Sequence, residues 1–214
     1  KSHTDQPFFA LVLSTSNHSP FEFPDGRIQL FDKEKATRNN AVKYADYAIG
    51  ELFRRAKQEE YYRNTVFVIV ADHDTRAPSD DLLPLEHFHI PGVIVGAGIE
   101  PRVMSQVASQ VDLLPTALDL LGIRTEHPMP GRDLLRLSPD DPGRAILQYY
   151  DVHGFLAGSH LVVHQPFGKP LQFRNQHGTL APEPVDPELE KDALAHVLLP
   201  WMIYREQRYR LPGA

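Results

Sequence analysis

The sequence predicts an α/β protein with a largely parallel sheet flanked by helices, followed by a small antiparallel sheet and a terminal helix. Short, continuous apolar runs alternate with segments of helical spacing, as in chains whose strands are covered on both faces. After about residue 144 the apolar segments are separated by glycine-containing turns, which is typical of antiparallel strands. We therefore divide the chain into residues 1–144, part of an α/β core, and residues 145–214, a small antiparallel subdomain.

Three apolar runs are predicted to be strands: residues 8–13 (FFALVL), 65–70 (TVFVIV) and 89–98 (HIPGVIVGAG). We expect the first two to be buried on both faces of the sheet. Residues 33–58 carry apolar side chains at helical spacing, and a second helix is expected within VDLLPTALDLLGI. Asp112 suits the N-cap of that helix, and Gly122 suits its C-terminal end.

The C-terminal third is predicted to be a set of short strands and one helix. AILQYYDVHGFLAGSHLVVHQP and PLQFRN have the pattern of antiparallel strands joined by turns. Residues 186–209 have a helical pattern, which Pro200 is expected to kink or interrupt.

Composition excludes several classes of protein. The 214 residues carry a net charge of −6, which gives no support for binding nucleic acid. There is no cysteine, so neither disulfides nor thiolate metal sites are available. Apolar runs stay well below the roughly 18 residues of a membrane span, so the chain itself is expected to be soluble.

Asp72 and His73 follow the second predicted strand directly, in the stretch TVFVIVADHDTR. Ligands of open α/β sheets collect beyond the carboxyl ends of the strands, where both side chains can point to one place. A carboxylate oxygen and an imidazole nitrogen together suit Mn²⁺, Zn²⁺ or Fe. The alternative is that Asp72 caps the next turn, because one Asp–His pair is a short motif.

Two further histidines are candidates for contacts with a substrate. His18 lies in STSNHSPFEFP, after the first predicted strand, where it could contact an anionic substrate or act as an acid or base. The alternative is a turn-rich loop that satisfies its own backbone. His87 and His89 flank Phe88, and His89, nearest the third strand, is the better candidate, unless it is simply structural.

Other enzyme classes have less support. Ser14, Ser16 and Ser19 lie near His18, so an unrelated serine hydrolase is a possible alternative, but no G-x-S-x-G elbow is present. No glycine-rich phosphate loop occurs either. The chain begins without methionine and enters an apolar run within a few residues, so we expect it to be part of a longer protein.

Four ordered motifs carry a resemblance to a known family: PFFALVLSTSNHSPFEFP, NNAVKYADYAIGELFRRAKQEEYYRNTVFVIVADHD, FHIPGVIVGAGI and ASQVDLLPTALDLLGI. Together they resemble the C-terminal half of the sulfatase-like catalytic domain of lipoteichoic acid synthases and phosphoglycerol transferases, in the alkaline phosphatase superfamily. The resemblance covers roughly residues 7–135 well and the remainder loosely.

The resemblance implies metal-dependent transfer or hydrolysis of a phosphodiester or sulfate ester. Family members hold one Mn²⁺-type ion with an Asp–His pair, a glutamate and the nucleophilic threonine. Asp72 and His73 match the metal-binding pair, and His18 matches the histidine that contacts the phosphoryl group. His89 lies near the active-site edge in related enzymes.

One departure from the family limits this expectation. The glutamate ligand and the threonine nucleophile lie upstream of the first motif, so no catalytic residue is expected in this chain. We therefore expect half of a catalytic domain, inactive alone. In the parent protein, a missing N-terminal region would attach it to the bacterial inner membrane, on the extracytoplasmic or periplasmic face. Its substrate could derive from phosphatidylglycerol. The alternative is a non-catalytic binding or regulatory module that keeps the fold.

Overall fold

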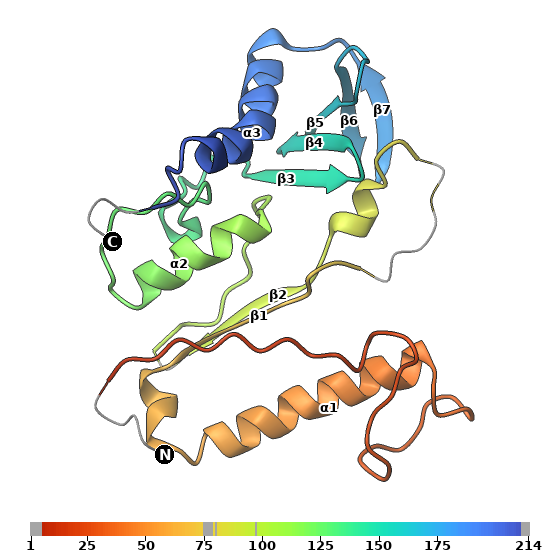
Figure 1. Cartoon of the computed structure of the whole chain (residues 1–214), viewed down its shortest axis with the longest axis vertical. Coiled ribbons are helices and arrows are strands. Elements are labelled where there is room, and N and C mark those ends of the chain that lie inside the picture. Colours follow the sequence, from red (N-terminus) through yellow and green to blue (C-terminus); the bar gives the residue numbers. More distant parts are fainter. Residues whose placement is uncertain (1–5, 75–78, 80, 97, 211–214) are drawn as a thin grey trace. The chain divides into compact units, whose positions relative to one another are not determined.

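The computed structural model describes residues 6–74, 79, 81–96 and 98–210. These described residues combine three α-helices with two sheets, in agreement with the predicted mixed α/β class (Figure 1). It forms two compact units, one of residues 1–65 and 96–98 and the other of residues 66–95 and 99–214.

The first unit is built around one long helix, α1 (Arg38–Ala56), which is followed by the short 3-10 helix η1 (Glu60–Asn64). The helix begins five residues later than the apolar spacing predicts, because Thr37 caps it by accepting a hydrogen bond from the backbone N–H of Asn40. Threonine is a favourable N-cap, and its extended backbone ends the preceding loop.

The buried side chain of Asn40 holds that loop in place. Its Oδ1 accepts hydrogen bonds from the backbone N–H groups of Phe31, at 2.7 Å, and Asp32, at 3.1 Å. Its Nδ2 donates to the carbonyl groups of Asp32, Glu34 and Lys35. Since a buried amide must find partners for both of its ends, this one residue determines the path of the chain into α1.

Residues 8–13 do not form the buried strand that their apolar run predicts. They adopt no regular secondary structure, and their side chains are exposed, with Phe9 at 80% and Val12 at 85%. A strand is stable only beside a hydrogen-bonded neighbour, which an apolar run alone cannot provide. Phe8 makes one packing contact, an edge-to-face contact with Tyr61 at 6.0 Å between ring centroids.

The second unit begins with two paired strands, β1 (Val66–Val70) and β2 (Gly92–Gly96), close to the predicted ranges. The backbone N–H of Ala71 donates to the carbonyl of Pro91 at 3.2 Å. The end of β1 therefore lies beside the start of β2, and the two strands run antiparallel.

The expected largely parallel sheet is thus not present in the described part of the chain, where all the strand pairings are antiparallel. A parallel connection needs a crossover element, usually an α-helix. The described part of the connection between β1 and β2 contains instead the 3-10 turn η2 (Leu85–Phe88). The parallel pairing that does occur is an isolated bridge between Val107 and Gly143.

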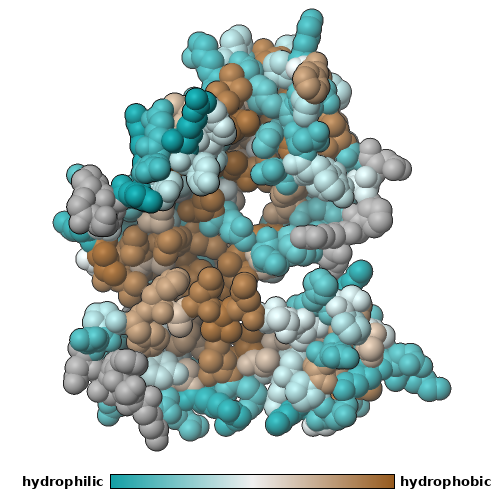
Figure 2. Space-filling model, viewed as in Figure 1, coloured by the Kyte–Doolittle hydropathy of each residue, from teal (hydrophilic) through white to brown (hydrophobic). Residues whose placement is uncertain are grey.

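The helix α2 (Leu113–Leu120) packs against β1 and follows a 3-10 turn, η3 (Gln110–Asp112). Gly122 ends it with a φ of +68°, as predicted. Asp112 precedes the helix, but its side chain does not cap α2, because it bonds to other backbone groups. Hydrophobic side chains lie at the surface around α2 and the turn after it, including Leu114, Leu121 and Ile123 (Figure 2).

Five antiparallel strands in sequence order form the second sheet, as predicted for the C-terminal third. They are preceded by the 3-10 turn η4 (Leu134–Arg136). The strands are β3 (Arg144–Tyr149), β4 (Val152–Ala157), β5 (His160–His164), β6 (Leu171–Gln176) and β7 (Thr179–Glu183).

Both faces of this sheet are covered. On one face, Leu161 and Val163 of β5 pack in a cluster with Leu83, and Leu85 and Phe88 of η2 pack against it. On the other face, helix α3 (Pro187–Arg205) contributes Ala193 to a cluster with buried side chains of β4 and β5. The η2 turn is therefore anchored to the C-terminal sheet, which fixes where its histidine lies.

The helix α3 (Pro187–Arg205) begins at Asp186, whose side chain caps it. Pro200 lies inside the helix without interrupting it, and α3 bends in its C-terminal half (Figure 1). Among the described residues, no helix combines the length and the apolar character that crossing a membrane requires.

Candidate metal and substrate site

Asp72 and His73 lie directly after β1, where the strand ends in an exposed turn. Oδ1 of Asp72 accepts a hydrogen bond from the backbone N–H of His73 at 2.9 Å, which orients the carboxylate. Oδ2 of Asp72 then lies 3.6 Å from Nε2 of His73. The two side chains thus turn one oxygen and one nitrogen toward each other.

The tautomer of His73 is fixed by its other ring nitrogen. Nδ1 lies 2.6 Å from the carbonyl oxygen of Asp74, and since a carbonyl can only accept, Nδ1 carries the proton. Nε2 is left with its lone pair, as a metal-binding histidine requires, and a backbone carbonyl is a usual partner for the opposite N–H. A separation of 3.6 Å also suits two bonds of about 2.0–2.2 Å to one ion. The pair therefore fits a divalent metal.

Two ligands do not complete a metal site. Within the described ranges, no group of three or more histidine, aspartate or glutamate side chains is placed to hold an ion. The arrangement provides half of a site at the end of β1, so further ligands would have to come from elsewhere.

A second histidine lies against this loop. Nδ1 of His87 donates to Oδ2 of Asp74 at 2.7 Å, and both side chains are largely shielded from solvent. His87 belongs to η2, so this hydrogen bond ties the loop after β1 to the turn that packs on the C-terminal sheet. The sequence-based preference for His89 rested on its position nearest the third predicted strand, and the structure places His89 directly after η2.

A glutamine supports the same loop from the start of α2. Nε2 of Gln110 donates to the carbonyl oxygen of Ala71 at 2.9 Å and lies 3.4 Å from that of Asp72. The side-chain amide thereby holds the carbonyl end of the residue that follows β1. Nothing in the sequence pattern singles out Gln110, because its partner is 39 residues away.

The segment that carries Gln110 is itself firmly held. Asp112 is buried, and its two carboxylate oxygens accept hydrogen bonds from the backbone N–H groups of Ser109, at 2.9 Å, and Arg132, at 2.7 Å. The hydroxyl of Ser109 accepts a hydrogen bond from the backbone N–H of Ile146 in β3. The start of α2 is thus fixed to the loop before η4 and to the five-stranded sheet.

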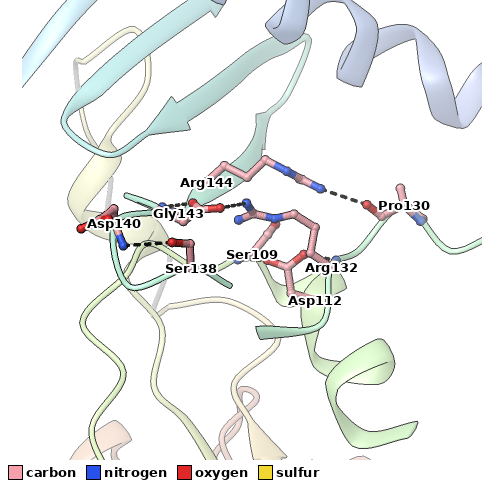
Figure 3. Close-up of polar contacts among 9 residues, drawn as sticks. Ser109, Asp112, Pro130, Arg132, Ser138, Asp140, Gly143 and Arg144 are labelled. Carbon is pink, nitrogen blue, oxygen red and sulfur yellow. Dashed lines mark hydrogen bonds and ion pairs between the residues drawn. The ribbon is translucent and has the colours of Figure 1, made fainter. Parts of the chain in front are cut away.

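Two arginines lie beside this anchor (Figure 3). Arg132 reaches Asp141 at 3.4 Å, and Arg144 donates to the carbonyl of Pro130 at 3.0 Å. Burial, together with the neighbouring charge of Arg132, lowers the pKa of Arg144. In the described part of the chain, three buried nitrogens of these guanidinium groups have no hydrogen-bond partner. These nitrogens are covered by protein atoms, so the pair serves packing here.

His18 and His89 are the other two residues that the sequence predicts for the site. His18 belongs to the first unit, where its Nδ1 donates to the carbonyl of Ser19 at 2.8 Å and leaves Nε2 on an exposed turn. His89 is exposed directly after η2. Among the contacts of the described residues, none joins His89 to Asp72 or His73.

The family model for sulfatases matches residues 1–123, more than half of the chain. The chain belongs to the sulfatase family. This membership confirms the resemblance that the four sequence motifs predict.

Relatives of this sulfatase-family chain include bacterial transferases. It is 28% identical over 156 residues to the lipoteichoic acid synthase-like protein YvgJ of Bacillus subtilis, an alignment covering 61% of this chain and 25% of the relative. It is 32% identical over 141 residues to phosphoglycerol transferase I of Xanthomonas campestris, an alignment covering 58% of this chain and 19% of that relative. The chain thus matches about a quarter or less of the length of these relatives.

A solved structure shows the same fold. A protein in the alkaline phosphatase superfamily from Vibrio parahaemolyticus superimposes with a TM-score of 0.92 at 40% identity. The match covers 97% of this chain and 52% of that protein. Nearly the whole fold described above therefore occurs as about half of a longer chain in that relative.

Proposed function

We propose that this chain is the C-terminal part of a metal-dependent enzyme that transfers or hydrolyses a phosphodiester or a sulfate ester, and that it is inactive alone. In this proposal Asp72 and His73 bind one divalent ion, with Mn²⁺ the best candidate. The glutamate ligand and the threonine nucleophile are supplied by a preceding part of the same polypeptide. Residues 1–144 are assigned to the catalytic core and residues 145–214 to a subdomain.

The observation that carries the proposal is the pairing of Oδ2 of Asp72 with Nε2 of His73, 3.6 Å apart at the end of β1. Backbone contacts occupy Oδ1 of Asp72 and Nδ1 of His73. Oδ2 of Asp72 and Nε2 of His73 therefore remain available to an ion. A turn-capping aspartate would need only the first of these contacts. The defined tautomer of His73 is what favours metal binding over capping.

The residues of this chain would act by binding and orientation. A bound divalent ion supplies Lewis-acid stabilisation of the negative charge that develops on the ester oxygens. Asp72 and His73 hold it and transfer no proton. His18, whose Nδ1 is occupied by the carbonyl of Ser19, is proposed to contact a phosphoryl or sulfuryl oxygen through Nε2. His89 is proposed to lie at the edge of the same site.

The relationship to a lipoteichoic acid synthase-like protein and to phosphoglycerol transferase I supports a phosphoglycerol-type substrate, which phosphatidylglycerol could supply. We propose an extracytoplasmic or periplasmic location for the parent protein, with membrane attachment through a region preceding this chain. The Asp–His pair itself does not distinguish phosphate esters from sulfate esters.

The first test is calorimetric titration of Mn²⁺ into this chain and into the longer polypeptide. Asp72→Asn should weaken binding by at least tenfold in both, since it removes the anionic ligand. Asp151→Asn is the matched control, because Asp151 is an exposed aspartate on the turn after β3. Equal binding in the wild type and in Asp72→Asn would contradict the metal assignment.

The second test separates catalysis from a binding role. The longer polypeptide, with Mn²⁺, should hydrolyse a chromogenic phosphodiester or sulfate ester, and chelation should abolish turnover. Metal binding without turnover of either ester would favour the alternative of a non-catalytic module. Turnover that persists after chelation would instead favour a metal-independent hydrolase.

A further inference from the structure

The C-terminal end of α3 carries a surface that the proposed catalytic site does not use. Its aromatic side chains are exposed, with Trp201 at 56% and Tyr204 at 75%. Arginines lie among them, and we call the whole set the aromatic-basic surface: Trp201, Tyr204, Arg205, Arg208, Tyr209 and Arg210. All six residues belong to the second unit.

The side chains of this surface are organised by contacts with each other. The guanidinium of Arg205 lies 4.8 Å from the centroid of the Trp201 ring, and that of Arg210 lies 5.7 Å from the Tyr209 ring. The rings of Tyr204 and Tyr209 stack at 6.2 Å. Cations are thus held over aromatic rings at the surface, where both remain available to a partner.

Beside the two tyrosines lies an apolar hollow of about 400 Å³. Met129 and Pro130 form one wall, and Ile203 of α3 forms another. The apolar character continues back along the helix, where Leu194, Leu198 and Met202 are also exposed. The hollow is open to solvent and has almost no polar lining, so it suits a hydrocarbon group rather than a polar ligand.

The charge of this surface differs from that of the chain. Residues 201–210 contain three arginines and one glutamate, a net charge of +2, whereas the whole chain carries −6. Arg205 lies in the last turn of α3, where a cation is favoured by the helix dipole. Arg208 and Arg210 follow the helix end, so the dipole does not explain them. Arg208 pairs with Glu206 at 2.6 Å, which leaves a net positive charge on this segment that complements an anionic partner.

We propose that the aromatic-basic surface binds the surface of a membrane that contains anionic phospholipid. Tryptophan and tyrosine are the side chains that favour the boundary between hydrocarbon and water, and arginines are attracted to anionic headgroups. The apolar hollow accepts the upper part of an acyl chain. This inference does not depend on the metal assignment, since it concerns different residues.

The sequence offers a direct probe, because Trp201 is the chain's single tryptophan. Its emission should move to shorter wavelength, and acrylamide should quench it less, when vesicles of phosphatidylcholine and phosphatidylglycerol are added. Vesicles of phosphatidylcholine alone should have a much smaller effect. Raising the salt concentration should weaken binding to the mixed vesicles, since the arginine contribution is screened.

Variants locate the binding surface. The triple change Arg205→Gln, Arg208→Gln and Arg210→Gln should lower the partition coefficient roughly a hundredfold, at about fivefold for each arginine. The matched control is Arg27→Gln, Arg54→Gln and Arg55→Gln, which changes the net charge equally at exposed positions of the first unit. This control should bind nearly as the wild type does.

Tyr204→Ser should reduce the shift in Trp201 emission. Tyr150 is also exposed, in the turn between β3 and β4, and Tyr150→Ser should leave the shift unchanged. The proposal is overturned if Trp201 responds to neither kind of vesicle, or if both triple variants lose binding equally. A shift in Trp201 emission that depends on protein concentration in the absence of lipid would indicate that the surface binds a second copy of the chain. That result would also overturn the membrane proposal.

Discussion

Nδ1 of His87 donates to Oδ2 of Asp74 at 2.7 Å, and this contact joins η2 to the loop that follows β1. The same loop is held from another direction by Gln110, through the carbonyl of Ala71. The Asp–His pair thus lies in an exposed turn whose backbone is supported on two sides. Supporting contacts of this kind are what hold a ligand set in a productive geometry.

His87→Ala should lower the free energy of unfolding by about 1 kcal/mol, because it removes one partner of a partly buried hydrogen-bonded pair. His89→Ala is the matched control, since that neighbouring histidine is exposed, and it should change stability by less than about 0.5 kcal/mol. Urea unfolding of both variants makes the comparison. Equal effects would mean that the His87–Asp74 hydrogen bond contributes nothing to holding the turn.

Asn40→Ala should destabilise the chain by about 3 kcal/mol, because it leaves several backbone groups of the loop before α1 without partners. Asn39 is exposed and makes one long contact, with Asp32 at 3.4 Å. Asn39→Ala therefore serves as the control and should be nearly neutral. Thermal and urea unfolding would measure the difference, and similar losses for both variants would contradict the role given to Asn40.

Two glycines should respond in opposite directions to alanine. Gly143 has a φ of +76°, and an added Cβ would lie 2.0 Å from the carbonyl oxygen of Val107, so Gly143→Ala should be strongly destabilising. Gly50 lies within α1 with open space around it. Gly50→Ala should therefore stabilise the helix by roughly 0.5–1 kcal/mol. Loss of stability at both positions would show that α1 is more tightly packed than described.

Glu183 gives the chain a defined response to acid. Hydrogen bonds from Gln172, His160 and Arg174 lower the pKa of its carboxyl to about 2. Because the folded pKa lies below the ordinary value of 4.5, the contribution of Glu183 to stability is complete above that value. It is lost as the pH falls towards 2.

Glu183→Gln should therefore lower stability at neutral pH and reduce the loss of stability between pH 4.5 and 2. Unfolding midpoints measured across this range, for the variant and the wild type, provide the test. Parallel pH profiles for the two proteins would show that other carboxylates account for the acid response.

The sequence predicts some parts of this structure well for identifiable reasons. The strand that precedes Asp72 and His73 is predicted correctly because an apolar run followed by an acid and a histidine is a local sequence pattern. The C-terminal strands β3 to β6 are predicted for the same reason, since each is bounded by its own turn, whereas β7 lies outside the predicted segments. Gly122 ends α2 as expected because a positive φ favours glycine at a helix end.

Other features depend on contacts between distant residues and leave no local pattern. Residues 8–13 and residues 66–70 have similar apolar composition, yet only the second segment is a strand. The direction of pairing between β1 and β2 is set by the route of the connection, not by either strand. The hydrogen bond of His87 to Asp74 depends on the packing of η2 on the C-terminal sheet, and that of Gln110 on a residue 39 positions away.

The exposed segment FFALVL has a consequence for handling the protein. It is extended, uncharged and free of proline, and Phe9, Leu11, Val12 and Leu13 are all more than three-quarters exposed. Such a segment is a template on which identical copies can add as intermolecular strands and seed aggregates. Working concentrations and storage of the 214-residue chain will therefore be limited by this segment before its folded parts lose stability.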